Sequence, residues 1–169
     1  ALAIETDIAQ QVASALSLRL GSSAELTSGG TRKPQAQDLL FKAIDEERHG
    51  NDTAESLRRA IGFLDQAIAI DPNYAKALAF KAYFVLASIS VWGEETMHHS
   101  SAEGVASARR AITLAPDFAL GHFALAFNHE TRLQFGAALK EYETAASLPG
   151  NSFDTLNEYS ELLLNFARF

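Results

Sequence analysis

The chain has 169 residues, of which 47% are hydrophobic, and it carries a formal net charge of −7 at pH 7. This acidic balance argues against nucleic-acid binding by this segment, which would need a basic face. The absence of cysteine excludes a disulfide framework and a thiolate zinc site, and no apolar run reaches the roughly 18 residues that would span a bilayer.

Residues 1–20 predict one amphipathic helix. Its apolar positions recur every four residues, at Ile4, Ile8, Val12 and Leu16. We expect this stripe to cap the first repeat of the following region or to fill its groove; alternatively it packs on an upstream domain or pairs with a second copy of the chain. The segment lacks the charged start and cleavage site of a signal peptide, and we expect a cytoplasmic location.

Residues 21–35 predict a flexible linker. The run from Ser28 to Pro34 contains two glycines and shows no apolar period, and Pro34 is suited to begin a helix. From there on, Ala, Leu and Ile at helical spacing predict a region that is nearly all α-helical.

An internal repeat organises this helical region. The turn around Pro72 returns, altered, around Pro116, 44 residues later, and the next interval, from Ala111 to Ala145, is 34 residues. A period of 34 is typical of the tetratricopeptide repeat (TPR), a helix–turn–helix unit. Small residues such as Ala126 stand where the helices of a pair would cross, because axes about 8–10 Å apart leave no room for larger side chains. Residues 36–169 therefore resemble the TPR family, which implies an all-α, right-handed α–α superhelix of helical hairpins.

The array divides into three helix pairs, 36–72, 73–116 and 117–150, and a final unpaired helix, 151–169. Compared with the third pair, the first is about five residues longer at His49–Thr53, and the second about ten residues longer near Ile89–Ser100. We expect these additional residues to form longer loops between the helices. The unpaired last helix predicts that the chain is part of a longer protein, because such arrays normally end in a polar capping helix.

The resemblance implies a concave groove lined by the first helix of each pair. A protein or peptide ligand is expected there, or a second copy of the chain in a homodimer. The candidate groove residues are five aromatic and three polar side chains: Phe41, Phe80, Tyr83, Phe123, Phe127, Glu130, Asn157 and Glu158. Alternatively, several of these aromatic residues pack between the repeats. A clamp for a peptide carboxylate is not expected, because Leu40, Ile44 and Ala79 stand where it needs cations or amides.

The order of the parts carries a narrower resemblance. An amphipathic helix, a linker and the run from Leu57 to Ala75 look like the C-terminal half of bacterial regulators with an upstream class III adenylate cyclase or winged-helix DNA-binding domain. This implies a protein-interaction or self-association scaffold, the regulatory TPR region of a bacterial adenylate cyclase. The alternatives are the TPR region of a winged-helix transcriptional regulator and a small-molecule sensor domain. Such a sensor would use the surface of Phe80, Tyr83, Phe123 and Phe127.

No catalytic residue, cofactor or metal site is predicted for this segment, which lacks a glycine-rich phosphate loop and a serine elbow. A contrasting hypothesis is an enzyme that binds a metal through Glu94, Glu95, His98 and His99. Neighbouring residues rarely converge on one ion in tetrahedral geometry, so we interpret this segment as part of the loop between helices. His122 and His129, two helical turns apart, are interpreted as packing or surface residues.

Overall fold

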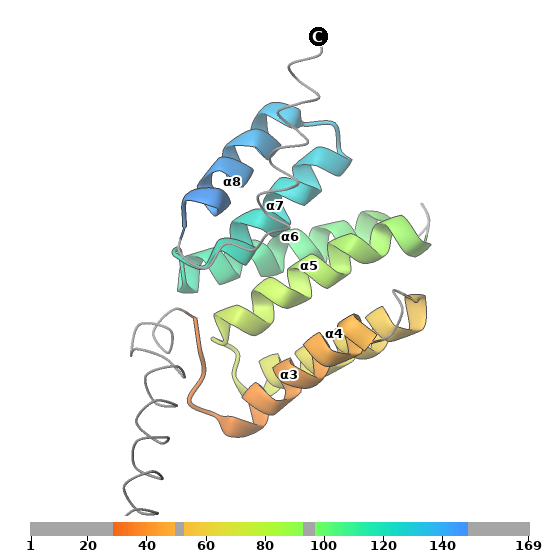
Figure 1. Ribbon diagram of the computed structural model, residues 1–169, viewed down its shortest axis with the longest axis vertical. Coiled ribbons are helices and arrows are strands. Elements are labelled where there is room, and N and C mark those ends of the chain that lie inside the picture. The colour runs from red at the N-terminus through yellow and green to blue at the C-terminus, as the bar shows by residue number, and fades with distance from the viewer. Residues whose placement is uncertain (1–28, 50–52, 93–96, 149–169) are drawn as a thin grey trace, which may run out of the picture.

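A computed structural model of the protein describes residues 29–49, 53–92 and 97–148 (Figure 1). Over these residues the chain forms six α-helices and no strand, so the prediction of an all-α, TPR-like fold is confirmed. The helices are α3 (Pro34–His49), α4 (Ala54–Ile70), α5 (Ala75–Trp92), α6 (Met97–Leu114), α7 (Ala119–Thr131) and α8 (Phe135–Ser147). The predicted helices at 1–20 and 151–169 and the first part of the linker lie outside the described residues.

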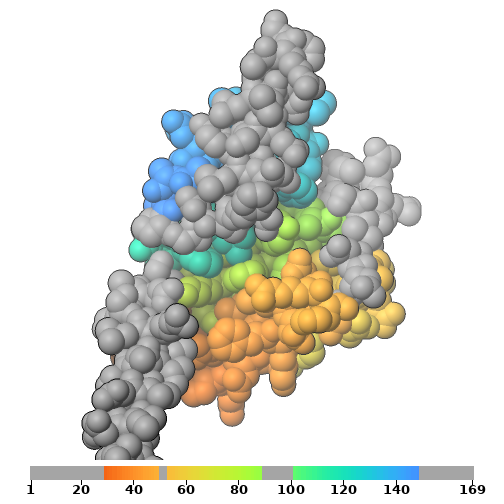
Figure 2. Space-filling model, in the orientation of Figure 1, coloured from red at the N-terminus to blue at the C-terminus, as the bar shows by residue number. Residues whose placement is uncertain are grey.

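The helices pack as three consecutive pairs, α3 with α4, α5 with α6, and α7 with α8 (Figure 1). Between pairs, α4 packs on α5, α6 packs on α7, and α5 also contacts α7. The space-filling view shows the result as successive bands of colour, each pair lying against its neighbour in the chain (Figure 2). This nearest-neighbour packing is how repeat arrays bury the apolar faces that a single pair leaves open.

The same backbone turn joins the pairs. Before Pro72, the amide of Asp71 donates to Ala67 at 2.9 Å, and the amide of Tyr74 then donates to Asp71 at 3.0 Å. The turn at Pro116 repeats this pattern with distances of 2.8 and 3.1 Å, and Phe118 takes the place of Tyr74. Proline suits this position, since it ends a helix and lacks the amide that a continuing helix would use.

The additional residues of the second pair lengthen its helices. α5 and α6 have 18 residues each, whereas α7 and α8 have 13 each. Residues 89–92 and 97–100 are helical, so the expectation of a long loop near Ile89–Ser100 is wrong. The physical reason is local: the run from Ala75 to Trp92 contains neither glycine nor proline, so no residue in it stops the helix.

Residues 29–33, which we call the strap, bind across both turns between the pairs. The carbonyl of Gly29 accepts from the amide of Lys76 at 3.0 Å, and the hydroxyl of Thr31 donates to the Asp71 carboxylate at 2.5 Å. Gly29 has a φ of +74°, and a Cβ placed on it would lie 3.0 Å from the Cβ atoms of both Ala75 and Ala115. This part of the predicted linker is therefore hydrogen-bonded to the turn between the first two pairs and to the start of α5.

The core is built from small residues at the helix crossings and larger ones between them. Fully buried alanines occur in every described helix: Ala36, Ala43, Ala60, Ala67, Ala77, Ala79, Ala82, Ala108, Ala124, Ala126, Ala138 and Ala145. Two glycines allow the closest approaches. A Cβ on Gly104 of α6 would lie 2.7 Å from Cγ of Leu86 in α5, and one on Gly121 of α7 would lie 2.9 Å from Cγ1 of Ile112. Close packing of this kind leaves no volume for an added methyl group.

Replacing Gly104 with alanine is expected to destabilise the protein. The added methyl group would overlap Leu86, which is 1% exposed, and overpacking of this kind typically costs about 1–3 kcal/mol. Gly62 in α4 is the matched control, because a Cβ there meets no atom within 4 Å and alanine favours a helix by up to about 1 kcal/mol. Urea unfolding should place G104A below and G62A at or above the wild-type stability; equal midpoints for the two variants would contradict the packing.

Tyr74 gives the fold a dependence on alkaline pH. Burial, together with the nearby Asp71 carboxylate, raises the pKa of Tyr74 from 10.0 to about 12. The fold therefore retains the phenolic proton at pH values at which the unfolded chain loses it. The stability should be intact below pH 10 and should fall between pH 10 and about 12. In Tyr74→Phe this part of the loss should disappear from urea unfolding curves, whereas parallel losses in both proteins would show that Tyr74 is not its source.

Candidate interaction surface

Five aromatic rings form a continuous string through the second and third pairs. Their order is Phe80, Phe84, Tyr83, Phe123 and Tyr142, from α5 through α7 to α8. Successive ring centroids lie 5.9, 5.8, 5.6 and 5.6 Å apart, in tilted or edge-to-face geometry. Such contacts stabilise a fold by about 0.5–1.5 kcal/mol each beyond the area they bury. The string therefore holds α5, α7 and α8 together.

This string contains three of the residues predicted to line the groove. Phe123 is buried, whereas Phe80 and Tyr83 are half-buried and pack against the core of the first pair. Phe127 lies elsewhere, against the cluster of Ala82, Leu86 and Ala108. Phe123 therefore packs between repeats, which is the alternative interpretation given above for these aromatic residues.

The remaining predicted groove residues differ in their surroundings. Phe41 on α3 is 57% exposed, which is the largest exposed fraction of any phenylalanine in the described residues. Glu130 accepts a hydrogen bond of 2.7 Å from the Tyr142 hydroxyl, so it is tied to the end of the aromatic string. Asn157 and Glu158 lie outside the described residues.

Lys81 forms two ion pairs that join neighbouring helices. Lys81 of α5 contacts Asp65 of α4 and Glu103 of α6 at 2.6 Å each, and its side chain is 13% exposed. Burial by itself lowers the pKa of Lys81, but the hydrogen bonds to the two carboxylates outweigh it and leave the pKa above its ordinary value. Lys81 therefore remains charged and links three helices.

The two histidines of α7 have separate partners. Nδ1 of His122 lies 2.8 Å from the carboxylate of Glu141 in α8, and Nδ1 of His129 lies 2.8 Å from the side-chain oxygen of Gln134. The first contact joins the helices of the third pair, and the second fixes the turn that follows α7. Their interpretation as packing or surface residues agrees with this geometry.

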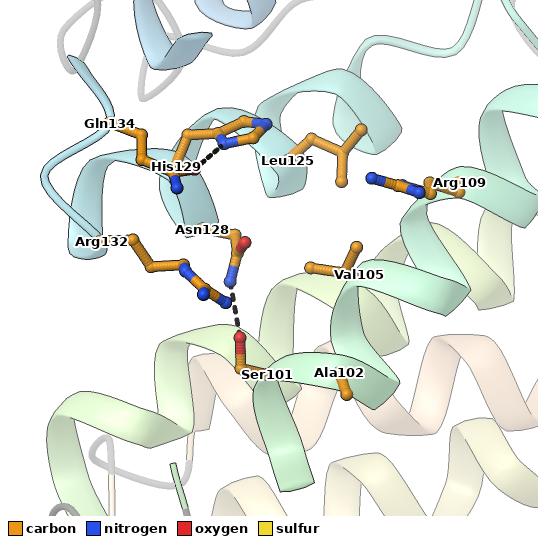
Figure 3. A pocket seen from close by; sticks show the side chains of 9 residues that line it. All are labelled: Ser101, Ala102, Val105, Arg109, Leu125, Asn128, His129, Arg132 and Gln134. Carbon is orange, nitrogen blue, oxygen red and sulfur yellow. Dashed lines mark hydrogen bonds between the residues drawn. The ribbon is translucent and has the colours of Figure 1, made fainter. Parts of the chain in front are cut away.

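A recess of about 240 Å³ opens between α6, α7 and the turn before α8 (Figure 3). It is lined by Ser101, Ala102, Val105, Arg109, Leu125, Asn128, His129, Arg132 and Gln134. Arg109 and Arg132 extend toward it from opposite sides (Figure 3). Sequence reasoning missed this recess, because spacing along the chain does not show that residues of different helices meet.

Within the described residues, no group of three or more His, Asp or Glu side chains is placed to hold a metal ion. The proposed metal ligands Glu94 and Glu95 lie outside this part, as do the side chains of His98 and His99. None of the helices described is long and apolar enough to cross a membrane.

No family model matches the chain. It is similar to serine/threonine-protein phosphatase 5 of Rattus norvegicus and of Mus musculus, with 27% identity over 143 residues in each case. The match covers 83% of this chain and 27% of each phosphatase, so the chain spans about a quarter of the length of these relatives. Phosphatase 5 has a TPR domain, and this similarity agrees with the stacked helix pairs. Both findings fit a TPR-like fold.

The hydrogen bond at the end of the aromatic string should contribute measurably to stability. Tyr142 is fully buried, and its hydroxyl donates to Oε2 of Glu130. Tyr142→Phe removes the donor and is expected to cost about 1–2 kcal/mol in chemical denaturation. Glu130→Gln keeps an acceptor and should cost less, and the double variant should be less destabilised than the sum of the two. Additive costs would show that the two side chains do not interact.

Proposed function

We propose that the chain is a protein-interaction scaffold that binds its partner on the face formed by the first helices of the pairs, α3, α5 and α7. The observation that carries the proposal is the stack of paired helices, whose repeating geometry presents one extended surface. The similarity to a protein that has a TPR domain supports the same class of function.

Phe41 is the best-placed anchor for such a partner. It lies on α3, it is 57% exposed, and the neighbouring Leu40 is buried in the core of the first pair. An aromatic side chain that is rigidly mounted and open to solvent loses little entropy on binding, and aromatic residues are common among the side chains that dominate binding energy. Phe80 and Tyr83, half-buried on α5, extend the apolar part of this face.

At a finer level, we propose that the scaffold is the regulatory TPR region of a bacterial adenylate cyclase, in which a partner or a second copy of the chain changes the geometry of the attached effector. This proposal rests on the resemblance of the helix, linker and Leu57–Ala75 arrangement. A winged-helix regulator is the alternative with the same support. A small-molecule sensor is less well supported, because the rings of Phe80, Tyr83 and Phe123 pack within the aromatic string and none of them lines the recess between α6 and α7.

Phe41→Ala tests the binding face. Leu114→Ala is the matched control, because Leu114 is 40% exposed and lies on α6, the second helix of its pair. Both variants should melt near the wild-type temperature, since neither side chain is buried. A partner captured by the wild-type chain should bind at least about tenfold more weakly to F41A and unchanged to L114A, measured by calorimetry. If the partner is a second copy, sedimentation should show the dimer weakened by F41A alone. Equal binding by all three proteins would contradict the proposed face.

A further inference from the structure

The recess between α6 and α7 gathers positive charge in an acidic chain. Arg109 extends from α6 and Arg132 from the end of α7, on opposite sides (Figure 3). Across the described ranges, neither guanidinium forms an ion pair within 4.0 Å, whereas Arg59 and Lys81 each contact two carboxylates. Two guanidinium groups that face a common space without a counter-charge repel one another, and an anion between them would relieve this repulsion.

The wall of the recess contains a buried hydrogen-bond donor. Nδ2 of Asn128 donates to the hydroxyl of Ser101 at 2.8 Å, and these residues are 5% and 8% exposed. A hydroxyl that accepts in this way still has its own hydrogen to donate. Within the residues that the structure describes, Ser101 has no acceptor for that hydrogen. Buried polar groups normally have partners, and the recess that Ser101 lines is where one would bind.

The dimensions limit the ligand to a small group. A volume of about 240 Å³ is below the roughly 300–1,000 Å³ of pockets that enclose drug-sized molecules. Val105 and Leu125 form an apolar part of the lining beside Arg109, and Ser101, Asn128 and Arg132 lie across the recess from Arg109 (Figure 3). The recess therefore suits one compact, charged head group, with the remainder of its carrier left outside.

We propose that this recess binds a phosphoryl group. The planar fork of arginine matches phosphate oxygens in a bidentate geometry, and the Ser101 hydroxyl adds a neutral donor. A phosphate monoester carries about −1.5 to −2 charge at pH 7, which matches two guanidinium groups better than a single carboxylate does. The carrier is either a free phosphate compound or a phosphorylated side chain. The site lies apart from Phe41 and does not depend on the proposed binding face.

The test is a titration of the full chain with inorganic phosphate and with N-acetyl-O-phosphoserine amide, at constant ionic strength maintained with sodium chloride. Amide NMR signals of residues 101–109 and 125–134 should shift and saturate. Arg109→Gln and Arg132→Gln should each weaken binding by about tenfold or more, because hydrogen bonds to charged groups contribute about 1.5–3 kcal/mol. Arg110→Gln is the matched control, since Arg110 is exposed on the same helix and does not line the recess.

The two ligands separate the possible carriers. Comparable affinities would support a free phosphate compound, and at least tenfold tighter binding of the phosphoserine amide would support a phosphorylated side chain. Sodium acetate should bind at least about tenfold more weakly than phosphate, because it carries one charge. The proposal is overturned by the absence of saturable shifts with both phosphates, by equal losses in R110Q and R132Q, or by acetate binding as tightly as phosphate. Because both recess arginines are exposed, their replacement should leave the fold intact. A melting curve of each variant checks this.

Discussion

The arrangement of the described helices depends on the close packing of α5. This helix contacts α4, α6 and α7, and its residues are apolar on almost every side. Buried alanines of α5 let neighbouring axes approach, and Gly104 of α6 lets α6 come within contact of Leu86. A helix surrounded in this way cannot rotate or shift without moving three neighbours. The charge of Lys81 in this helix is balanced by two carboxylates, Asp65 of α4 and Glu103 of α6.

The strap adds a constraint that nearest-neighbour packing alone does not supply. Gly29 lies against Ala75, which begins α5, and against Ala115, which precedes α7. It therefore touches the turns on both sides of the second pair, and the bond from Thr31 to Asp71 holds it there. In a repeat array, small rotations between pairs add up to the curvature of the whole surface. A segment that bridges two successive turns restricts those rotations.

The sequence predicted most of the fold and less of the surface. Helical periodicity, the repeated proline turns and small residues such as Ala126 indicated stacked helix pairs, and Ala126 is fully buried. The strap was missed because its glycines and threonine indicate only an absence of local preference, whereas its bond to Asp71 joins residues 40 positions apart. Helix lengths were missed because counting inserted residues does not reveal their conformation. The recess required knowledge of which residues of α6 and α7 face each other.

The most exposed residues of the proposed binding sites are not the residues that build the core. The aromatic residues that the repeat pattern assigned to a groove are partly used for packing: Phe123 is buried between Tyr83 and Tyr142, and a partner could reach it only by separating the pairs. Phe41 and the two recess arginines contribute little to the core, since each is exposed. The exposed ring of Phe41 and the unpaired charges of the two arginines are unfavourable in the free protein. Because a ligand that covers these side chains would offset that cost, we propose that binding uses them rather than buried rings such as Phe123.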